Sequence, residues 1–230
     1  MEKNSNHAFD AQLKVQNLIA KNGIIVDATI VKAPVQHISE KEREVIDKGE
    51  MPKEWKENPA ILRQRDTDAA WTKKHGKSYF GYKDHVKVDR ESKVILSFEV
   101  TPANDHDSQL VETLLDEEQD AGQEIHADAA YIGEPIRQIL CKNNVKDRRH
   151  KKAMKNVPLS KYQKRQNRYK SRIRARVEHV FGAMSMKMMD IRVRTIGRVR
   201  ATFVIGMRNI IYNMFRFDYL MRSRVRYIQT

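Results

Sequence analysis

Hydrophobic positions along the chain repeat with two different periods. After a stretch from Ala8 to Ala20 that can form a helix, Gly23 precedes Ile24 to Val31, a run that is apolar on both faces and rich in β-branched side chains. This pattern predicts a central strand that is buried on both sides. Pro34 closes the strand, because proline cannot donate to a neighbouring strand.

A charged segment follows, from about residue 35 to 78. It contains Pro52 and Pro59 and both tryptophans of the chain, Trp55 and Trp71. We interpret it as an insertion after the first strand, helical from Glu40 to Lys48 and otherwise loop.

Strand-like alternation returns at residue 82. Val86 and Val88 alternate with Lys87 and Asp89, which predicts a half-buried antiparallel hairpin. The remaining expected elements, in chain order, are the two hairpin strands (Tyr82–Asp89 and Lys93–Thr101), a helix capped by Asp107 or Ser108 (Gln109 to about Asp120), a strand (Glu124–Ala129), a helix (Glu134–Asn143), a possible strand outside the core (Val145–Arg149), a long basic helix (Ser160–Met188) and a final amphipathic helix (Val199–Met221).

This order predicts an α/β fold in which a mixed sheet is flanked by helices, because short connections then satisfy every element. It is the strand and helix order of the RNase H-like fold. We expect residues 1–22 to be a remnant N-terminal segment and residues 23–221 to form one domain, with the insertion at about 35–78 and a basic helical C-terminal part at about 151–221.

The positive charge is concentrated in one segment. The chain has 44 Lys and Arg against 30 Asp and Glu. Residues 142–200 hold 20 of the basic residues and only three acids, a net of +17, whereas the rest carries 24 basic and 27 acidic residues. Such a segment is typical of a surface that follows nucleic-acid phosphates, although a basic surface that only aids solubility stays an alternative.

Other classes of protein are disfavoured. Cys141 is the only cysteine, so an internal disulfide or a zinc knuckle is excluded. The sequence has no apolar run of membrane-spanning length, and its first residues lack the apolar core of a signal peptide. We therefore expect a cytoplasmic protein that is not a membrane protein and is nucleoid-associated when bound to DNA.

Three acids occupy positions that solubility does not explain. Asp27 interrupts the apolar first strand, where a charge is costly unless it is paired or binds a metal. Asp128 lies between small alanines at the end of a strand, and Glu178 lies beside the apolar stripe of the basic helix, one turn after Arg174. The alternatives are a turn-stabilising Asp27, a helix-capping Asp128 and an exposed Glu178 that relieves repulsion among arginines.

These acids and the motifs around them resemble bacterial insertion-sequence transposases of the DDE (Asp, Asp, Glu) superfamily, in particular the insertion-sequence-five group. The resemblance runs from about Gly23 to Leu220. Its pieces are residues 25–31, 66–77, 81–85 (Gly-Tyr-Lys-Asp-His), 104–108, 127–131 (Ala-Asp-Ala-Ala-Tyr), 176–182 (Arg-Val-Glu-His-Val-Phe-Gly) and 193–197.

The resemblance implies roles for single residues. Asp27, Asp128 and Glu178 match the three catalytic acids and would hold two Mg²⁺ or Mn²⁺ ions, and Arg174 matches the arginine of the family's tyrosine, arginine, glutamate, lysine signature. The tyrosine position falls on Ser171, with Tyr169 nearby, and the lysine position on Ser185, with Lys187 nearby. Family members usually carry a helical domain before the first catalytic strand, so the chain is expected to be truncated.

The implied activity is metal-dependent cleavage of DNA at the element's ends, followed by strand transfer into target DNA. The expected partners are double-stranded DNA, both element ends and target, and further copies of the chain in a homo-oligomer on DNA. The basic residues that we expect to hold the DNA backbone are Lys151, Lys152, Arg168, Arg172, Arg176 and Lys187. Two other functions remain open: an RNase H-like nuclease without strand transfer, and a catalytically impaired, truncated remnant that only binds DNA.

Overall fold

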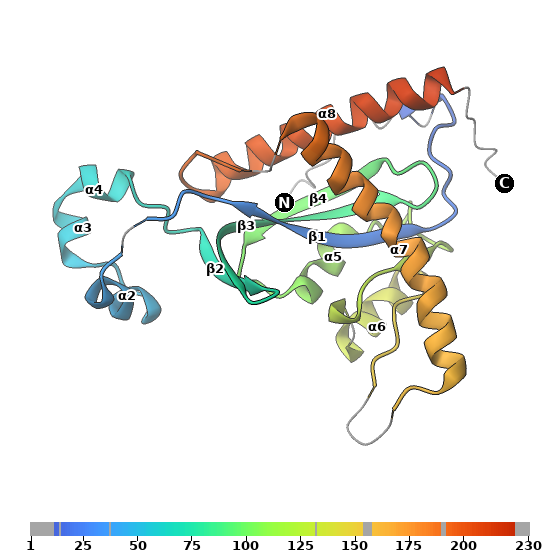
Figure 1. Ribbon diagram of the computed structural model, residues 1–230, viewed down its shortest axis with the longest axis horizontal. Helices are drawn as coiled ribbons and strands as arrows, with labels where there is room; N and C mark the ends of the chain where they lie inside the picture. The colour runs from blue at the N-terminus through green and yellow to red at the C-terminus, as the bar shows by residue number, and fades with distance from the viewer. Residues whose placement is uncertain are drawn as a thin grey trace.

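A computed structural model describes residues 12–13, 15–36, 38–131, 133–153, 158–189 and 192–223. Its centre is a six-stranded mixed sheet with strand order β2-β3-β1-β5-β6, in which β4 also pairs with β3 (Figure 1). The α/β prediction of a mixed sheet flanked by helices is therefore confirmed. The strands are β1 (Ile24–Lys32), β2 (Ala70–Lys74), β3 (Lys77–Asp89), β4 (Ile95–Pro102), β5 (Glu124–His126) and β6 (Lys146–Asp147).

Strand β1 lies at the middle of the sheet, as its two-sided apolar pattern predicted. It pairs antiparallel with β3 and parallel with β5. Successive side chains enter different clusters: Ile24 and Val26 pack on the side of the short helices, whereas Ile25 packs on the side of the long C-terminal helices. Because side chains alternate along a strand, Asp27 shares the face of Ile25.

Helices cover both faces of the sheet (Figure 1). The short elements η1 (Asp107–Leu110), α5 (Val111–Leu114), η2 (Ala129–Tyr131) and α6 (Glu134–Lys142) lie on one side. The long helices α7 (Lys161–Met188) and α8 (Arg198–Arg222) lie on the other. Ser160 caps α7 through a capping box with Gln163, which confirms the predicted start of the basic helix.

The insertion is shorter than predicted. It forms a helical lobe beside the sheet, composed of α2 (Glu40–Asp47), α3 (Lys53–Glu57) and α4 (Pro59–Arg63) (Figure 1). Trp55 is buried in this lobe and donates its indole N–H to Glu42, 2.7 Å away. Residues 70–78, which the sequence analysis assigned to the insertion, instead contribute β2 and the start of β3 to the sheet. The short β2 has no clear alternation, because most of its side chains are not buried.

The helix predicted from Gln109 to Asp120 is wrong in its length. Helical structure begins at Asp107 with His106 as the cap, and α5 ends at Leu114. Side-chain bonds then favour a turn: Asp116 accepts from the backbone of Glu118, and its own N–H donates to Asp120. Acidic side chains that compete for backbone N–H groups favour turns over helices.

The N-terminal segment packs into the domain where it is described. Leu13, Leu18 and Ile19 are buried against Val94 and Leu220. The predicted helix from Ala8 to Ala20 lies partly outside the described residues, and the chain leaves helical geometry at Asn17, whose φ is 53°.

Candidate active site

Asp27 projects from the middle of β1 toward α7. Its Oδ1 accepts the N–H of Ala28 at 2.9 Å, and its Oδ2 accepts Nη1 of Arg174 at 2.9 Å. Burial raises the pKa of Asp27, the nearby Asp128 charge adds to that rise, and the Ala28 N–H, Arg174 and Lys74 oppose it. A partly buried carboxylate in the central strand is therefore held in place by one backbone donor and one guanidinium.

Asp128 reaches the same place through strand register. Ile24 lies opposite Ile125, and Ile25 lies opposite His126, in the parallel pair of β1 and β5. Continuing this register by two residues sets Asp128 opposite Asp27, on the face of the sheet that α7 covers. Asp128 itself is exposed and lies two residues beyond His126, the last residue of β5. The electrostatic effect of Asp128 on Asp27 agrees with this proximity.

Glu178 joins the site through Arg174. The guanidinium donates Nη1 to Asp27 and Nη2 to Oε1 of Glu178, the second at 3.3 Å. The Glu178 side chain is 62% exposed, so it can be reached from solvent. Thus the structure brings Asp27 and Asp128 together, and Arg174 connects Glu178 to Asp27.

The donor chemistry of this site suits a hard divalent cation. Mg²⁺ and Mn²⁺ prefer carboxylate oxygens, and repulsion between Asp27 and Asp128 would be relieved by a cation. Within the described part of the chain, however, no three acidic, histidine or cysteine side chains are arranged to hold a metal as they stand. The carboxylates fit a divalent cation by type, and the Arg174 guanidinium provides the positive charge between Asp27 and Glu178.

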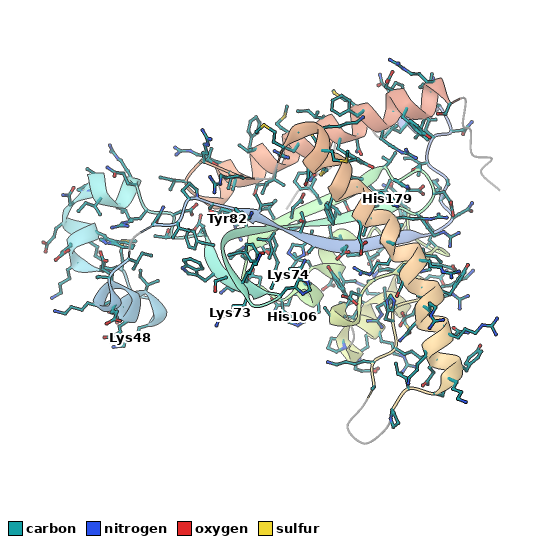
Figure 2. The ribbon with its side chains drawn as sticks, in the orientation of Figure 1. Lys48, Lys73, Lys74, Tyr82, His106 and His179 are labelled. Carbon is teal, nitrogen blue, oxygen red and sulfur yellow. The ribbon has the colours of Figure 1, made fainter. Side chains whose placement is uncertain are left out.

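A small hollow of about 230 Å³ is lined by residues of β1, β2, β3 and α7, and none of the three acids lines it. Ser185, at the signature's lysine position, lines it, and the positive charge there comes from Lys32 and Lys74 instead. Figure 2 shows Lys74 beside Lys73 on β2. The sequence analysis missed both lysines of the hollow. Lys74 could have been noticed in the basic run Lys73-Lys74-His75-Gly76-Lys77, but its place near Asp27 depends on how β2 pairs.

A match to a known family decides what kind of protein carries this site. Residues 19–214 match the family model described as "Transposase DDE domain". The chain belongs to the DDE transposase family. The transposase for insertion sequence element IS1106 of Neisseria meningitidis serogroup B is 31% identical over 204 residues, which are 89% of this chain and 67% of that protein. No solved structure gives a significant match.

Ser171 occupies the signature's tyrosine position in this DDE transposase, and it links α7 to the end of β5. Ser171 Oγ lies 2.9 Å from Nε2 of His150, and Nδ1 of His150 lies 3.1 Å from the carbonyl oxygen of Ala127. The two contacts connect α7 to the residue before Asp128. They therefore help to fix the distance between the helix that carries Glu178 and the end of β5.

Tyr131 lies buried beneath the acids of the DDE transposase. Burial raises the pKa of its phenol, and the charges of Asp107, Asp27 and Asp128 raise it further. Its hydroxyl is buried without a hydrogen-bond partner among the described residues. His126 is also buried, and burial lowers its pKa to about 4, so it is a neutral packing residue.

In the basic segment of the DDE transposase, residues 142–200, some basic side chains are exposed and others are bonded to groups of the protein itself. Lys151, Lys152, Arg168 and Arg172 are exposed. Other basic residues are bonded within the protein: Arg176 donates to Glu91 at 2.6 Å, Lys170 to the carbonyl of Arg149 at 2.7 Å, and Lys187 lies 4.7 Å from the ring centre of Phe215. Only part of the +17 charge is thus free to meet a ligand.

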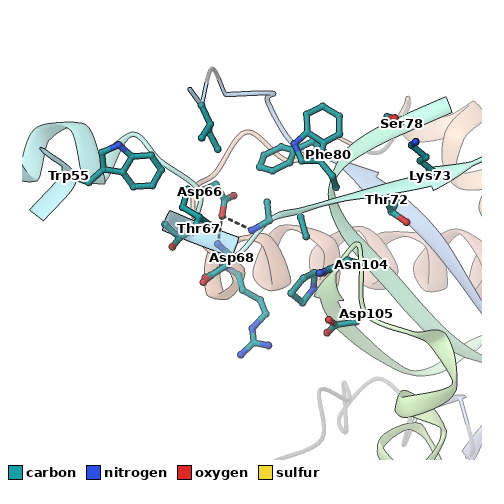
Figure 3. Close-up of a pocket in the computed structure, with 17 residues that line it drawn as sticks. Trp55, Asp66, Thr67, Asp68, Thr72, Lys73, Ser78, Phe80, Asn104 and Asp105 are labelled. Atoms are coloured by element: carbon teal, nitrogen blue, oxygen red, sulfur yellow. Dashed lines mark hydrogen bonds between the residues drawn. The ribbon is translucent and has the colours of Figure 1, made fainter. Parts of the chain in front are cut away.

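A larger hollow, of about 1140 Å³, lies between the helical lobe and the β2–β3 hairpin (Figure 3). Trp55, Asp66 and Phe80 are among its lining residues, and the three acids are not. His106 caps η1 and contacts Ser108. Within the described residues, no helix is long and apolar enough to span a bilayer.

Proposed function

We propose that this DDE transposase cleaves DNA at the ends of an insertion sequence and joins the freed ends to target DNA. Asp27, Asp128 and Glu178 are the proposed catalytic acids. One observation carries the proposal: Arg174 bonds both Asp27 and Glu178, at a place where the charge of Asp128 also acts on Asp27.

The three acids are the proposed ligands of two Mg²⁺ or Mn²⁺ ions. When bound, such ions supply Lewis-acid activation of the attacking oxygen and stabilisation of the leaving oxygen. Asp27 is prepared for this role because the Ala28 N–H fixes one of its oxygens. Arg174 donates to both Asp27 and Glu178 and so holds the two carboxylates near each other.

The proposed reaction has two displacements at phosphorus. Water attacks the phosphodiester at the element's end, which breaks the bond to the 3′ oxygen and releases a 3′-hydroxyl. That hydroxyl then attacks a target phosphodiester and displaces its 3′ oxygen, so no covalent enzyme–DNA bond forms. Lys74, whose charge acts on Asp27, is suited to bind a phosphate of the reacting strand.

The exposed basic residues outside the acids would hold the DNA backbone. Lys151 and Lys152 precede α7, and Arg168 and Arg172 lie on its exposed side. Phosphate contacts of this kind set affinity and register more than sequence choice. We propose double-stranded DNA, both element ends and target, as the partner.

The test is cleavage and joining of a labelled duplex that carries an element end. Asp27→Asn, Asp128→Asn and Glu178→Gln should each reduce Mg²⁺-dependent cleavage by at least about a thousandfold, since each removes a charged metal ligand. DNA affinity at the same salt should change little. Glu112→Gln is the matched control, because Glu112 is an exposed acid on α5.

Three results would contradict the proposal. Cleavage at the parent rate by one of the three variants would remove that acid from the site. Hydrolysis without joined products would favour the nuclease alternative, and DNA binding without any metal-dependent cleavage would favour a catalytically impaired protein.

A further inference from the structure

Lys83 of β3 and Asp107 of η1 form an ion pair on the face of the sheet that the short helices cover. Nζ of Lys83 donates to Oδ1 of Asp107 at 2.8 Å and to the carbonyl oxygen of Asp105 at 2.7 Å. The side chains of the pair are 15% and 25% exposed. Such a pair adds little to stability, because desolvation offsets most of the attraction. Its clearest effect is to fix where η1 begins and where the Asp107 carboxylate lies.

The short helix η1 contacts η2, the element that directly follows Asp128. The N–H of Tyr131, the last residue of η2, donates to the carbonyl oxygen of Asp128 at 3.1 Å. The Tyr131 side chain packs in one apolar cluster with Val26 and Ala127. These two residues come directly before Asp27 and Asp128 in the sequence. Tyr131 therefore lies against both segments of the chain that carry the proposed aspartate ligands.

The hydroxyl of Tyr131 is buried, and among the described residues it has no hydrogen-bond partner. A buried hydroxyl without a partner destabilises the folded chain, and phenylalanine would pack the same ring without that cost. Burial raises the pKa of Tyr131, and the carboxylates of Asp107, Asp27 and Asp128 raise it further, in that order of effect. The hydroxyl thus lies among three acids, and Asp107 acts on it most strongly.

We propose that Tyr131 is a positioning residue for Asp128. Lys83 and Asp107 in turn position its hydroxyl: Oδ1 of Asp107 accepts Lys83, and the second oxygen accepts the Tyr131 hydroxyl when the acids bind metal. That bond ties η2 to η1 and holds Asp128 where it coordinates the cation. Bonds from groups around the ligands orient the ligands, and losing one typically weakens metal binding by about 10- to 100-fold. The inference rests on the proposed function, in which Asp128 binds a divalent cation.

The experiment titrates Mn²⁺ into the full chain without DNA and measures free Mn²⁺ by electron paramagnetic resonance. Tyr131→Phe should weaken Mn²⁺ binding by about tenfold or more, because the bond that holds η2 is lost. In metal-free buffer the denaturation midpoint of this variant should be no lower than that of the parent, because only an unpaired hydroxyl has been removed. A purely structural role for the hydroxyl would instead lower the midpoint and leave the affinity for Mn²⁺ unchanged.

Tyr212→Phe is the matched control. Tyr212 is also buried, but its hydroxyl donates to the carbonyl oxygen of Lys93 at 2.9 Å. Loss of this bond should lower the denaturation midpoint and leave the affinity for Mn²⁺ within about twofold of the parent value. The two tyrosine variants should therefore differ in opposite ways from the parent chain.

Lys83→Gln tests the ion pair. It should also weaken Mn²⁺ binding, because Asp107 is no longer held beside the tyrosine. The double variant of Lys83→Gln and Tyr131→Phe should bind Mn²⁺ within about twofold of the weaker single variant, since both substitutions break the same connection through Asp107.

Asp27→Asn distinguishes a failure of the positioning role from a failure of the proposed function. If Asp27→Asn weakens Mn²⁺ binding and Tyr131→Phe does not, the positioning role is wrong and the proposed catalytic acids stand. If Asp27→Asn leaves Mn²⁺ binding unchanged, the acids do not hold the ion, and both are overturned. Fully additive losses for Lys83→Gln and Tyr131→Phe would show that Lys83 does not act through the tyrosine, which would also overturn the inference.

Discussion

The two long C-terminal helices pack on the same face of the sheet through inner faces of different composition. Helix α7 directs apolar residues inward, among them Ile173 and Val177, and leaves charged side chains on the outside. Helix α8 buries Asn213 beside apolar residues such as Ile205, and it leaves other apolar side chains, such as Phe203, exposed. Apolar burial therefore holds α7 to the sheet, whereas for α8 side-chain hydrogen bonds to the backbone of a strand add to that burial.

The difference also separates the proposed roles of the two helices. The outer and flanking residues of α7 include Glu178, Arg174 and the exposed Arg172, which face the acids or solvent. Helix α8 contacts β4 and supplies none of the three proposed catalytic acids. The predictions below test the inner face of α7, then the inner face of α8, and then the outer charges of α7.

The largest change in the free energy of unfolding is expected from substitutions on the apolar inner face of α7. Met184 is fully buried, so Met184→Ala should lower the free energy of unfolding by about 3 kcal/mol through lost burial and a cavity. Met186, on the same helix but 89% exposed, is the control: Met186→Ala should change stability by less than about 0.5 kcal/mol. Chemical denaturation measures both, and equal losses would contradict the assigned faces.

The next largest change in stability is expected at Asp84, a buried acid that contacts the inner face of α8. Asp84 on β3 is fully buried and accepts from Asn209 of α8 at 3.3 Å. Burial raises its pKa to about 7, against the opposing effects of Asn209 and Arg208. In the unfolded chain the pKa is lower, so protonation of Asp84 favours the folded state, and this stabilisation is lost as the pH rises toward 7.

Stability should therefore fall between about pH 5 and about pH 7, by on the order of 2 kcal/mol from this group. Asp84→Asn should remove most of that slope, because an amide does not ionise. The control is Asp218→Asn, which changes an exposed acid on α8 and should keep the slope. Denaturation curves across this pH range that are parallel for parent and Asp84→Asn would refute the assignment.

The smallest change in the free energy of unfolding is expected from substitution of charged residues on the outer side of α7. Arg176 and Glu91 are each about a third exposed, so Arg176→Gln should cost no more than about 0.5 kcal/mol and less at high salt. Arg176 donates to Glu91, whereas Arg172 is exposed and forms no such ion pair with the described residues. We therefore expect Arg172→Gln to matter more for DNA.

DNA titrations at several salt concentrations distinguish the two arginines. Arg172→Gln should reduce the slope of log affinity against log salt by about one, and Arg176→Gln should leave it unchanged. An equal reduction of the slope for both variants would indicate that Arg176 also contacts DNA phosphates, as the sequence predicted.

Much of the fold could be predicted because its signals are local. The two-sided apolar run of β1, the Ser160 cap of α7 and the length of α8 each depend on a few neighbouring residues. The end of the insertion and the length of α5 could not be predicted in this way. Strand β2 exists because it pairs with β3, and α5 stops because Asp116 and Asp120 bond to nearby backbone groups.

The sequence by itself determined the family, through motifs along the chain, and the α/β order of elements. It also predicted three candidate acids, of which Asp27 is the clearest because an acid inside an apolar strand is costly. Only the tertiary structure decided which charges meet: Arg174 with Asp27 and Glu178, Arg176 with Glu91, and Lys74 near Asp27. It also decided that Asn209 and Asn213 are buried among the apolar inner residues of α8. Hydrophobic periodicity shows that a helix has two faces, but the groups available on the sheet determine which face is buried.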